Sequence, residues 1–253
     1  MTGSFTFESI AKSHVGLVRK LNEDAFVDRP MIGLWAVADG MGGHQAGDVA
    51  SRLISEALDA VTPAMSGFLF LTEVKESLSR VNRTLIAQSS QMAEGSLIGS
   101  TVVALLAFDG HFACVWAGDS RAYLFRDGQL RRLSRDHSVV QELTDSGYMT
   151  VEDARHSKRA NVITRAVGVH KDLVLDVVQG PSDPGDRYLL CSDGLTGLVE
   201  DTEIAQILSQ SPLDAAAEDL IALTLERGAK DNVTVVIIEA HSGKDDTRQT
   251  QRP

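Results

Sequence analysis

The order of apolar segments along the chain predicts an α+β fold in which antiparallel sheets are covered by helices. Strand-like segments come first, followed by two helical segments, more strands, two further helical segments and a final strand. Strands in the middle of the chain are joined by short turns such as Asp109-Gly110, which are typical of antiparallel hairpins. With 253 residues, of which 43% are hydrophobic, the chain is long enough to bury one large core.

Nine segments rich in apolar and β-branched residues are expected to form strands. In chain order they are Phe5–Ala11, Ala25–Asp28, Ile32–Ala38, Thr101–Phe108, His111–Ala117, Arg121–Phe125, Leu173–Val178, Arg187–Cys191 and Val233–Ile238. The run Ile32–Ala38 is almost entirely apolar and is followed by Asp39-Gly40-Met41-Gly42-Gly43. We therefore expect a buried strand there that ends in a flexible loop at Asp39.

Apolar residues three and four positions apart predict helices in the remaining segments. They are expected at Val49–Val61, Val74–Leu85, Val139–Asp145, Thr202–Leu208 and Ala215–Leu225. The segment Ser134–Val169 is polar and irregular around its short helix, and we interpret it as a surface flap. Residues 241–253 are rich in charged and polar side chains, which predicts a disordered tail after a single domain of residues 1–240.

Composition narrows the classes of function. The formal net charge is −11, so we expect no binding to nucleic acid. No apolar stretch reaches the ~20 residues of a membrane span and the first residues lack a secretory pattern, so we expect no membrane insertion and a cytoplasmic location. Cys114 and Cys191 both lie in apolar, strand-like runs and are expected to be buried free thiols.

Acidic residues recur in turns at the edges of the predicted strands. The turns are Asn22-Glu23-Asp24, Asp39-Gly40, Gly118-Asp119-Ser120, Ser192-Asp193-Gly194 and Asp231-Asn232. Each turn alone is explained by ordinary turn chemistry, but Asp39 and Asp193 follow apolar strands, where a carboxylate requires a compensating charge. Oxygen ligands without histidine or cysteine partners indicate magnesium or manganese. Two such ions can activate water for displacement at phosphorus, which predicts hydrolysis of phosphate esters.

Six short motifs follow one another in a characteristic order. They are His14-Val15-Gly16-Leu17-Val18-Arg19-Lys20-Leu21-Asn22-Glu23-Asp24, Ala36-Val37-Ala38-Asp39-Gly40-Met41-Gly42-Gly43-His44, Gly99-Ser100-Thr101, Gly118-Asp119-Ser120-Arg121, Ser192-Asp193-Gly194 and Asp231-Asn232. Their order and separation resemble the motifs of the PPM family, the type 2C metal-dependent serine/threonine protein phosphatases, and are most similar to bacterial members. The resemblance extends roughly from Phe5 to Ile238.

The resemblance implies roles for the acidic positions. Asp39 would bridge two metal ions, and the Gly40 carbonyl would complete one coordination shell. Asp193 and Asp231 would hold the other ion, and Glu23 would ligate through a water molecule.

Three further residues gain roles from the same motifs. Asp119, together with Asp193, matches a third and weaker metal position of bacterial members, and Asp24 would orient waters or a ligand beside the metal ions. We assign Arg19 to the substrate phosphate, because a guanidinium is always charged and its paired donors match phosphate oxygens. The alternative for Arg19 is a surface salt bridge.

The proton donor for the leaving group is less well defined. Many eukaryotic members have Asp-Gly-His where this chain has Asp39-Gly40-Met41, and a thioether donates no proton. A metal-bound water or His44 would protonate the serine or threonine oxygen instead, although His44 is equally explained as a loop residue bonded to backbone. His137 matches a motif at the start of the flap and is given a structural role.

We therefore expect a four-layer αββα sandwich of two antiparallel sheets flanked by helices, with the metal centre at one end. The expected function is hydrolysis of phosphoserine and phosphothreonine by direct attack of water activated by two or three Mn²⁺ or Mg²⁺ ions. The expected partners are phosphorylated proteins, including a bacterial serine/threonine kinase of eukaryotic type that the enzyme opposes, and the chain is expected to be a monomer. Two alternatives remain open at this point: an inert domain that binds phosphoproteins, and a phosphatase for small phosphate esters.

Overall fold

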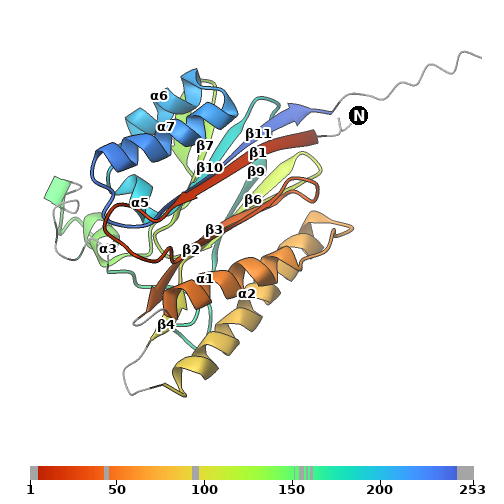
Figure 1. Ribbon diagram of the computed structural model, residues 1–253. Coiled ribbons are helices and arrows are strands. Elements are labelled where there is room, and N and C mark those ends of the chain that lie inside the picture. The colour runs from red at the N-terminus through yellow and green to blue at the C-terminus, as the bar shows by residue number, and fades with distance from the viewer. Residues whose placement is uncertain are drawn as a thin grey trace, which may run out of the picture.

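The computed structural model describes residues 5–42, 46–92, 97–150, 152–153, 157, 159 and 162–243. Two antiparallel β-sheets lie face to face, and helices cover the outer face of each (Figure 1). This confirms the αββα sandwich expected from the sequence.

The first sheet contains the first and the last strand of the domain. Its strands, in order across the sheet, are β1 (Phe5–His14), β11 (Val233–Ser242), β10 (Arg187–Cys191), β7 (Arg121–Arg126) and β8 (Gln129–Arg132). Strand β1 pairs with β11 along its whole length, so that His14 lies opposite Val233. This pairing places the loop that follows His14 beside the residues that precede Val233.

The second sheet carries the strand with Asp39. Its strands, in order, are β2 (Asp24–Arg29), β3 (Leu34–Gly42), β5 (Val102–Phe108), β6 (His111–Ala117) and β9 (Asp176–Pro181), and the short β4 (Ile98–Ser100) pairs with the end of β3. Strands β6 and β7 belong to different sheets, so the turn at 118–120 that joins them crosses from one sheet to the other.

The helices pack on the outer faces of the sheets through apolar stripes. Helices α1 (Ala46–Asp59) and α2 (Gly67–Ser89) cover the second sheet, and α5 (Asp193–Thr196), α6 (Asp201–Gln210) and α7 (Leu213–Glu226) lie against the first (Figure 1). In α1 the buried residues Ala50, Ile54 and Leu58 recur every four positions, which is the spacing of one helix face. No helix in the described ranges combines the length and the apolar character needed to cross a bilayer.

Strand β3 differs from its expected boundary. It continues to Gly42 because Gly40, Met41 and Gly42 pair with Ser100, Gly99 and Ile98 of β4, a strand that the sequence pattern did not indicate. The expectation of a loop from Asp39 onward was therefore wrong. Asp39 lies inside a strand, so its backbone is held on both sides of the carboxylate.

Two later strands also end elsewhere than expected. Strand β9 is Asp176–Pro181 and not Leu173–Val178, because its residues pair with β6 from Trp116 back to His111. Strand β11 continues to Ser242, since β1 supplies a partner for each of its residues. Ordered structure therefore extends two residues past the expected domain boundary at 240, and residues 244–253 of the expected tail lie outside the described residues.

The segment expected to be a flap is closed by a bridge within itself and is attached to the body near its end. Helix α3 (Val139–Asp145) begins after Ser138, whose hydroxyl accepts the backbone N–H of Gln141 at 3.3 Å. Isolated bridges pair Ser138 with Ile163 and Ser100 with Val167. Its role as a flap stays a prediction.

Candidate active site

Five aspartates gather at one end of the sandwich, where strands from both sheets end. Asp24 opens β2 and lies directly opposite Asp39 on β3, and Asp119 lies in the turn between β6 and β7. Asp193 is the first residue of α5, and Asp231 precedes β11. The charges of the other four all act on Asp39 and raise the pKa of its carboxyl group, after burial, which is the largest cause. The fold thus brings together residues from five separate parts of the chain.

The backbone of Asp39 is fixed by its neighbours. The N–H of Asp39 donates to the Thr101 hydroxyl at 3.1 Å, and its carbonyl accepts the Thr101 N–H at 2.8 Å and the Ser100 hydroxyl at 2.9 Å. The Thr101 hydroxyl also pairs with that of Ser120 at 2.7 Å. This chain of contacts links the strand of Asp39 to the turn that carries Asp119.

Glu23 lies where the end of β3 meets the start of α1. Its carbonyl accepts the Gly40 N–H at 3.0 Å, and its own N–H donates to the Asn232 side chain at 2.8 Å. Burial raises the pKa of Glu23, while the charge of Arg19 and a hydrogen bond from the Gly47 N–H lower it. A Cβ at Gly40 would collide with the Gly47 carbonyl and stand 2.7 Å from the Glu23 carbonyl oxygen, so this approach requires glycine.

Asn232 holds the loop that carries Arg19. Its side-chain NH₂ donates to the carbonyls of Val15 at 2.9 Å and Leu21 at 3.0 Å, at either end of that loop. Within the loop, Arg19 donates from Nη2 to Asp231 Oδ2 at 2.8 Å, with both side chains partly exposed. The sequence had shown Asn232 only as part of a motif. A buried Asn that bridges two distant carbonyls has no local signature, so its role required the fold.

Asp24 has one satisfied and one unsatisfied carboxylate oxygen. Oδ2 accepts the hydroxyls of Ser192 at 2.8 Å and Thr234 at 2.7 Å, whereas Oδ1 is buried and has no hydrogen-bond partner among the described residues. The pKa of Asp24 is raised to about 7, by burial first and also by the charge of Asp193, although the two hydroxyl donors lower it. A buried carboxylate oxygen without a donor is costly unless a cation or water reaches it.

The carboxyl groups of Asp193 and Asp119 also have raised pKa values. Burial is the largest cause that raises the pKa of Asp193, followed by the charge of Asp231, and a hydrogen bond with Asp39 lowers it. Burial also raises the pKa of Asp119 to about 8, and the charge of Asp193 adds to the effect. Charged carboxylates at these positions therefore require nearby positive charge.

Asp48 is an acidic neighbour that the sequence analysis missed. It lies in the first turn of α1, its Oδ1 is buried without a hydrogen-bond partner among the described residues, and its charge raises the pKa of Glu23. An acidic residue in the first turn of a helix is ordinarily explained by the helix dipole, so the sequence offered no separate signal.

The donor set fits a hard divalent cation. The side chains are carboxylates with no cysteine or histidine among them. A cation would reduce the repulsion between these carboxylates and would give the unpaired Asp24 oxygen a partner. Among the described residues, no group of three or more histidine, cysteine, aspartate or glutamate side chains is placed so that it could hold a metal ion without rearrangement. Magnesium is usually held by a few carboxylates and several waters, and an open cluster of this kind is compatible with that preference.

Three other groups were candidates for a part in the chemistry: the two cysteines, Met41 and His44. Cys114 and Cys191 are buried free thiols, as expected, and burial raises the pKa of Cys191 to about 12, so neither is a nucleophile. Met41, in β3, is paired with Gly99 of β4, and its thioether offers no proton. His44, the possible proton donor, lies outside the described residues.

Comparisons with known proteins identify close relatives of the whole domain. A family model described as Protein phosphatase 2C matches residues 17–231. The chain is 36% identical over 232 residues to the serine/threonine phosphatase stp of Listeria monocytogenes serotype 4b, covering 88% of this chain and 92% of that protein. It is 38% identical over 229 residues to the serine/threonine protein phosphatase PstP of Mycobacterium tuberculosis H37Rv, covering 90% of this chain and 44% of PstP.

Two solved structures share the fold closely. One is PppA, described as a key regulatory component of T6SS in Pseudomonas aeruginosa, with a TM-score of 0.87, 44% identity and coverage of 94% of this chain and 100% of that one. The other is the catalytic domain of PstP in complex with two manganese ions, with a TM-score of 0.85, 37% identity and coverage of 94% and 100%.

Proposed function

The chain belongs to the protein phosphatase 2C family and is a metal-dependent serine/threonine protein phosphatase, and we propose that the acidic cluster at the end of its sandwich is the catalytic centre. The observation that carries the assignment of the centre is the position of Asp39, which lies opposite Asp24 in the sheet and whose carboxyl group is acted on by the charges of Asp24, Asp119, Asp193 and Asp231. Among the described residues of this cluster, Asp24 has a buried carboxylate oxygen without a hydrogen-bond partner, which a cation or water would satisfy.

The assignment of ligands follows the geometry and the family motifs. Asp39 and the Gly40 carbonyl would hold one ion, and Asp39, Asp193 and Asp231 would hold the second. Glu23 would ligate through water, and Asp119 with Asp193 would hold a third and weaker ion. Mn²⁺ or Mg²⁺ at these positions supplies a water of lowered pKa and positive charge for the phosphate oxygens. The two manganese ions bound to the PstP catalytic domain support this choice of metal.

Arg19 is proposed to bind the substrate phosphate. Its guanidinium is partly exposed, and its charge acts on Glu23, Asp39 and Asp231, so it lies beside the cluster and is open to solvent. The ion pair with Asp231 corresponds to the alternative role for Arg19, a surface salt bridge. A surface pair of this kind adds only about 0–1 kcal/mol to the free energy of unfolding, so the guanidinium is free to rearrange. Two parallel donors then suit two phosphate oxygens.

Asp24 is proposed to hold and orient water within the centre. Its Oδ2 is fixed by two hydroxyl donors, and its Oδ1 remains available as an acceptor. The source of the proton for the leaving serine or threonine oxygen is either a water in the centre or His44, which stays a proposal. Attack by water is direct, since both cysteines are buried and no covalent intermediate is required.

The substrates are phosphorylated proteins, and we infer that they include a bacterial serine/threonine kinase that this enzyme opposes. The names of the stp and PstP relatives support a role in serine/threonine dephosphorylation, and the description of PppA supports a regulatory setting such as control of secretion. A monomeric state and a cytoplasmic location remain predictions.

Phosphate release from a phosphothreonine peptide tests this function. We expect turnover with Mn²⁺, none with EDTA, and a collapse of turnover in Asp193→Asn. Absence of turnover in a protein shown by calorimetry to bind Mn²⁺ would favour the inert-domain alternative. Turnover of a small aryl phosphate without turnover of any phosphopeptide would favour the small-ester alternative.

A further inference from the structure

The turn that carries Asp119 is bonded to the start of segment 134–169. The N–H of His137 donates to the Gly118 carbonyl at 2.9 Å, and the Gly118 N–H donates back to His137 Nδ1 at 3.2 Å. Gly118 has φ of +117°, and a Cβ there would stand 2.6 Å from the Thr101 side chain. The turn is thus confined between His137 on one side and Thr101 on the other.

His137 is held in one orientation. Because Nδ1 accepts the Gly118 N–H, Nε2 carries the proton, which it donates to Asp176 Oδ2 at 3.2 Å. The ring stacks on Trp116, with centroids 6.1 Å apart, and the Trp116 indole N–H donates to the Arg135 carbonyl at 2.8 Å. The residue has the structural role expected from the sequence, and the structure shows which part of the molecule it supports.

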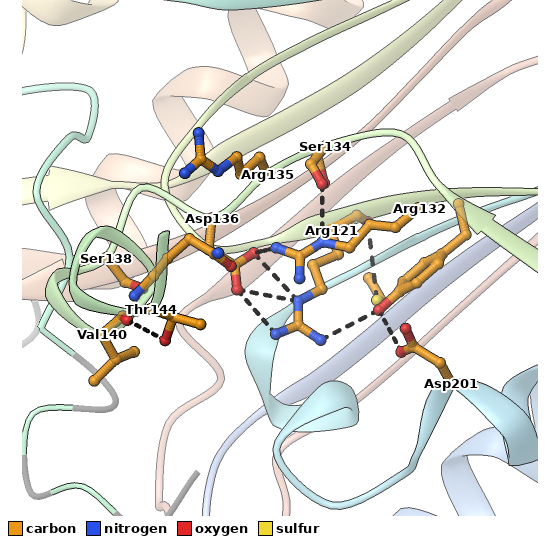
Figure 2. Close-up of polar contacts among 12 residues, drawn as sticks. Arg121, Arg132, Ser134, Arg135, Asp136, Ser138, Val140, Thr144 and Asp201 are labelled. Carbon is orange, nitrogen blue, oxygen red and sulfur yellow. Dashed lines mark hydrogen bonds and ion pairs between the residues drawn. The ribbon is translucent and has the colours of Figure 1, made fainter. Parts of the chain in front are cut away.

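A second connection runs through two arginines that share one aspartate. Arg121, two residues after Asp119, donates from Nε and Nη2 to both oxygens of Asp136 at 2.9–3.2 Å, and Arg132 donates to Asp136 Oδ1 (Figure 2). The Arg121 Nη1 also donates to the Tyr123 hydroxyl at 3.3 Å, which in turn donates to Asp201 at 2.9 Å. The guanidinium of Arg121 is therefore held by Asp136 and Tyr123.

Arg121 is the first residue of β7 and lies two residues after Asp119, so its side chain is anchored beside the turn that carries that carboxylate. A guanidinium released from Asp136 would be free to pair with the Asp119 carboxylate and so compete with a cation for it. Asp136 is positioned to prevent this.

We propose that Arg121, Asp136 and His137 are positioning residues that hold the Asp119 carboxylate ready for a divalent cation and connect that position to the base of segment 134–169. The inference rests on the proposed role of Asp119 as a metal ligand. It assigns to the base of the expected flap a set of direct contacts with the turn that carries Asp119.

Calorimetric titration of Mn²⁺ into the metal-free full chain tests this proposal, and Asp119→Asn identifies the weak binding phase. In Asp136→Asn the Kd of that phase is expected to rise by about tenfold or more, the usual effect of losing a residue that orients a ligand, with the tight phases unchanged. His137→Leu removes the acceptor for Gly118 and is expected to weaken the same phase, whereas His137→Asn, whose side-chain oxygen can take the place of Nδ1, is expected to restore it.

Asp186→Asn is the matched control. Arg126, at the other end of β7, donates from Nε and Nη2 to both oxygens of Asp186 at 2.6 Å, so this variant breaks the same kind of pair far from the centre. It is expected to lower the melting temperature and leave the Mn²⁺ titration unchanged. If Asp136→Asn does not fold, as judged by circular dichroism, the two His137 variants decide.

Three results would overturn the inference. They are a weak phase unchanged in both Asp136→Asn and His137→Leu, an equal shift of that phase in Asp186→Asn, and the absence of a weak phase in the unsubstituted chain. In each case the proposed catalytic centre still stands if Asp39→Asn abolishes the tight phases. Tight phases that survive Asp39→Asn would contradict the proposed function itself.

Discussion

Asp24 lies directly opposite Asp39 in the antiparallel register of β2 and β3, so two acidic side chains share one face of the sheet with no basic residue between them. Like charges directly opposite in a sheet are destabilising. The strand pairing therefore places two carboxylates where they repel each other and destabilise the fold, and a bound cation would remove this repulsion.

The metal-free protein is expected to lose stability as the pH rises. The pKa values of Asp24 and Asp119 in the folded chain are about 7 and about 8, above the ordinary value of 3.8, so folding favours their protonated forms. The native state then binds more protons than the unfolded state between about pH 4 and 8, and the free energy of unfolding falls as the pH rises through this window. Melting temperatures in EDTA between pH 5 and 8.5 measure the effect. Asp24→Asn is expected to flatten the decline, and a steeper decline in this variant would contradict the account.

Manganese is expected to stabilise the fold through the same carboxylates. At a free concentration one hundred times the Kd, one bound ion adds about 2.7 kcal/mol, which corresponds to a rise in melting temperature of about 5–10 °C for a domain of this size. Asp39→Asn and Asp193→Asn are expected to abolish the rise, and Asp214→Asn, at an exposed position in the first turn of α7, is expected to retain it. A full rise in Asp39→Asn would remove this residue from the centre.

Arg19→Ala is expected to reduce kcat/KM for a phosphopeptide by about 10–100-fold, because a charge-assisted hydrogen bond contributes about 1.5–3 kcal/mol. Arg19→Lys is expected to recover only part of the loss, since an ammonium lacks the paired donors. The melting temperature is expected to stay nearly constant in both variants. Lys20→Ala, at the adjacent exposed position, is the control, and an equal loss of kcat/KM there would indicate a general charge effect.

Gly40→Ala is expected to destabilise the fold by about 2 kcal/mol or more, because the added Cβ would collide with the Gly47 carbonyl. Gly128→Ala is the comparison, with φ of +74° and no atom within 4 Å of the added carbon, so that it measures the cost of a left-handed conformation alone. Chemical denaturation of both variants gives the two free energies. Equal losses would show that crowding at Gly40 is relieved by movement of α1.

Thiol reagents are expected to leave the native enzyme active and unmodified. Cys114 and Cys191 are both fully buried, and burial raises the pKa of each thiol, so almost no thiolate is exposed at neutral pH. Mass spectrometry after treatment with iodoacetamide is expected to show no adduct on the native chain and two on the denatured chain. Rapid inactivation of the native enzyme by the reagent would contradict direct attack by water.

The sequence by itself determined whether most segments form helices or strands, and it identified most acidic residues of the proposed centre. Apolar periodicity marks the strands and helices because a local pattern decides which face of an element is buried. Acidic turns after apolar strands indicated metal ligands, because a carboxylate at the edge of a core requires positive charge.

The tertiary structure decided what depends on contacts between distant segments. Strand β3 continues past Asp39 only because β4, more than fifty residues away in the chain, supplies its hydrogen bonds, and no local pattern encodes that pairing. For the same reason only the fold showed that Asn232 secures the loop of Arg19 and that Asp136 and His137 support the Asp119 turn. Side-chain partners of this kind are fixed by the packing of the two sheets, which brings together the strand ends that carry them.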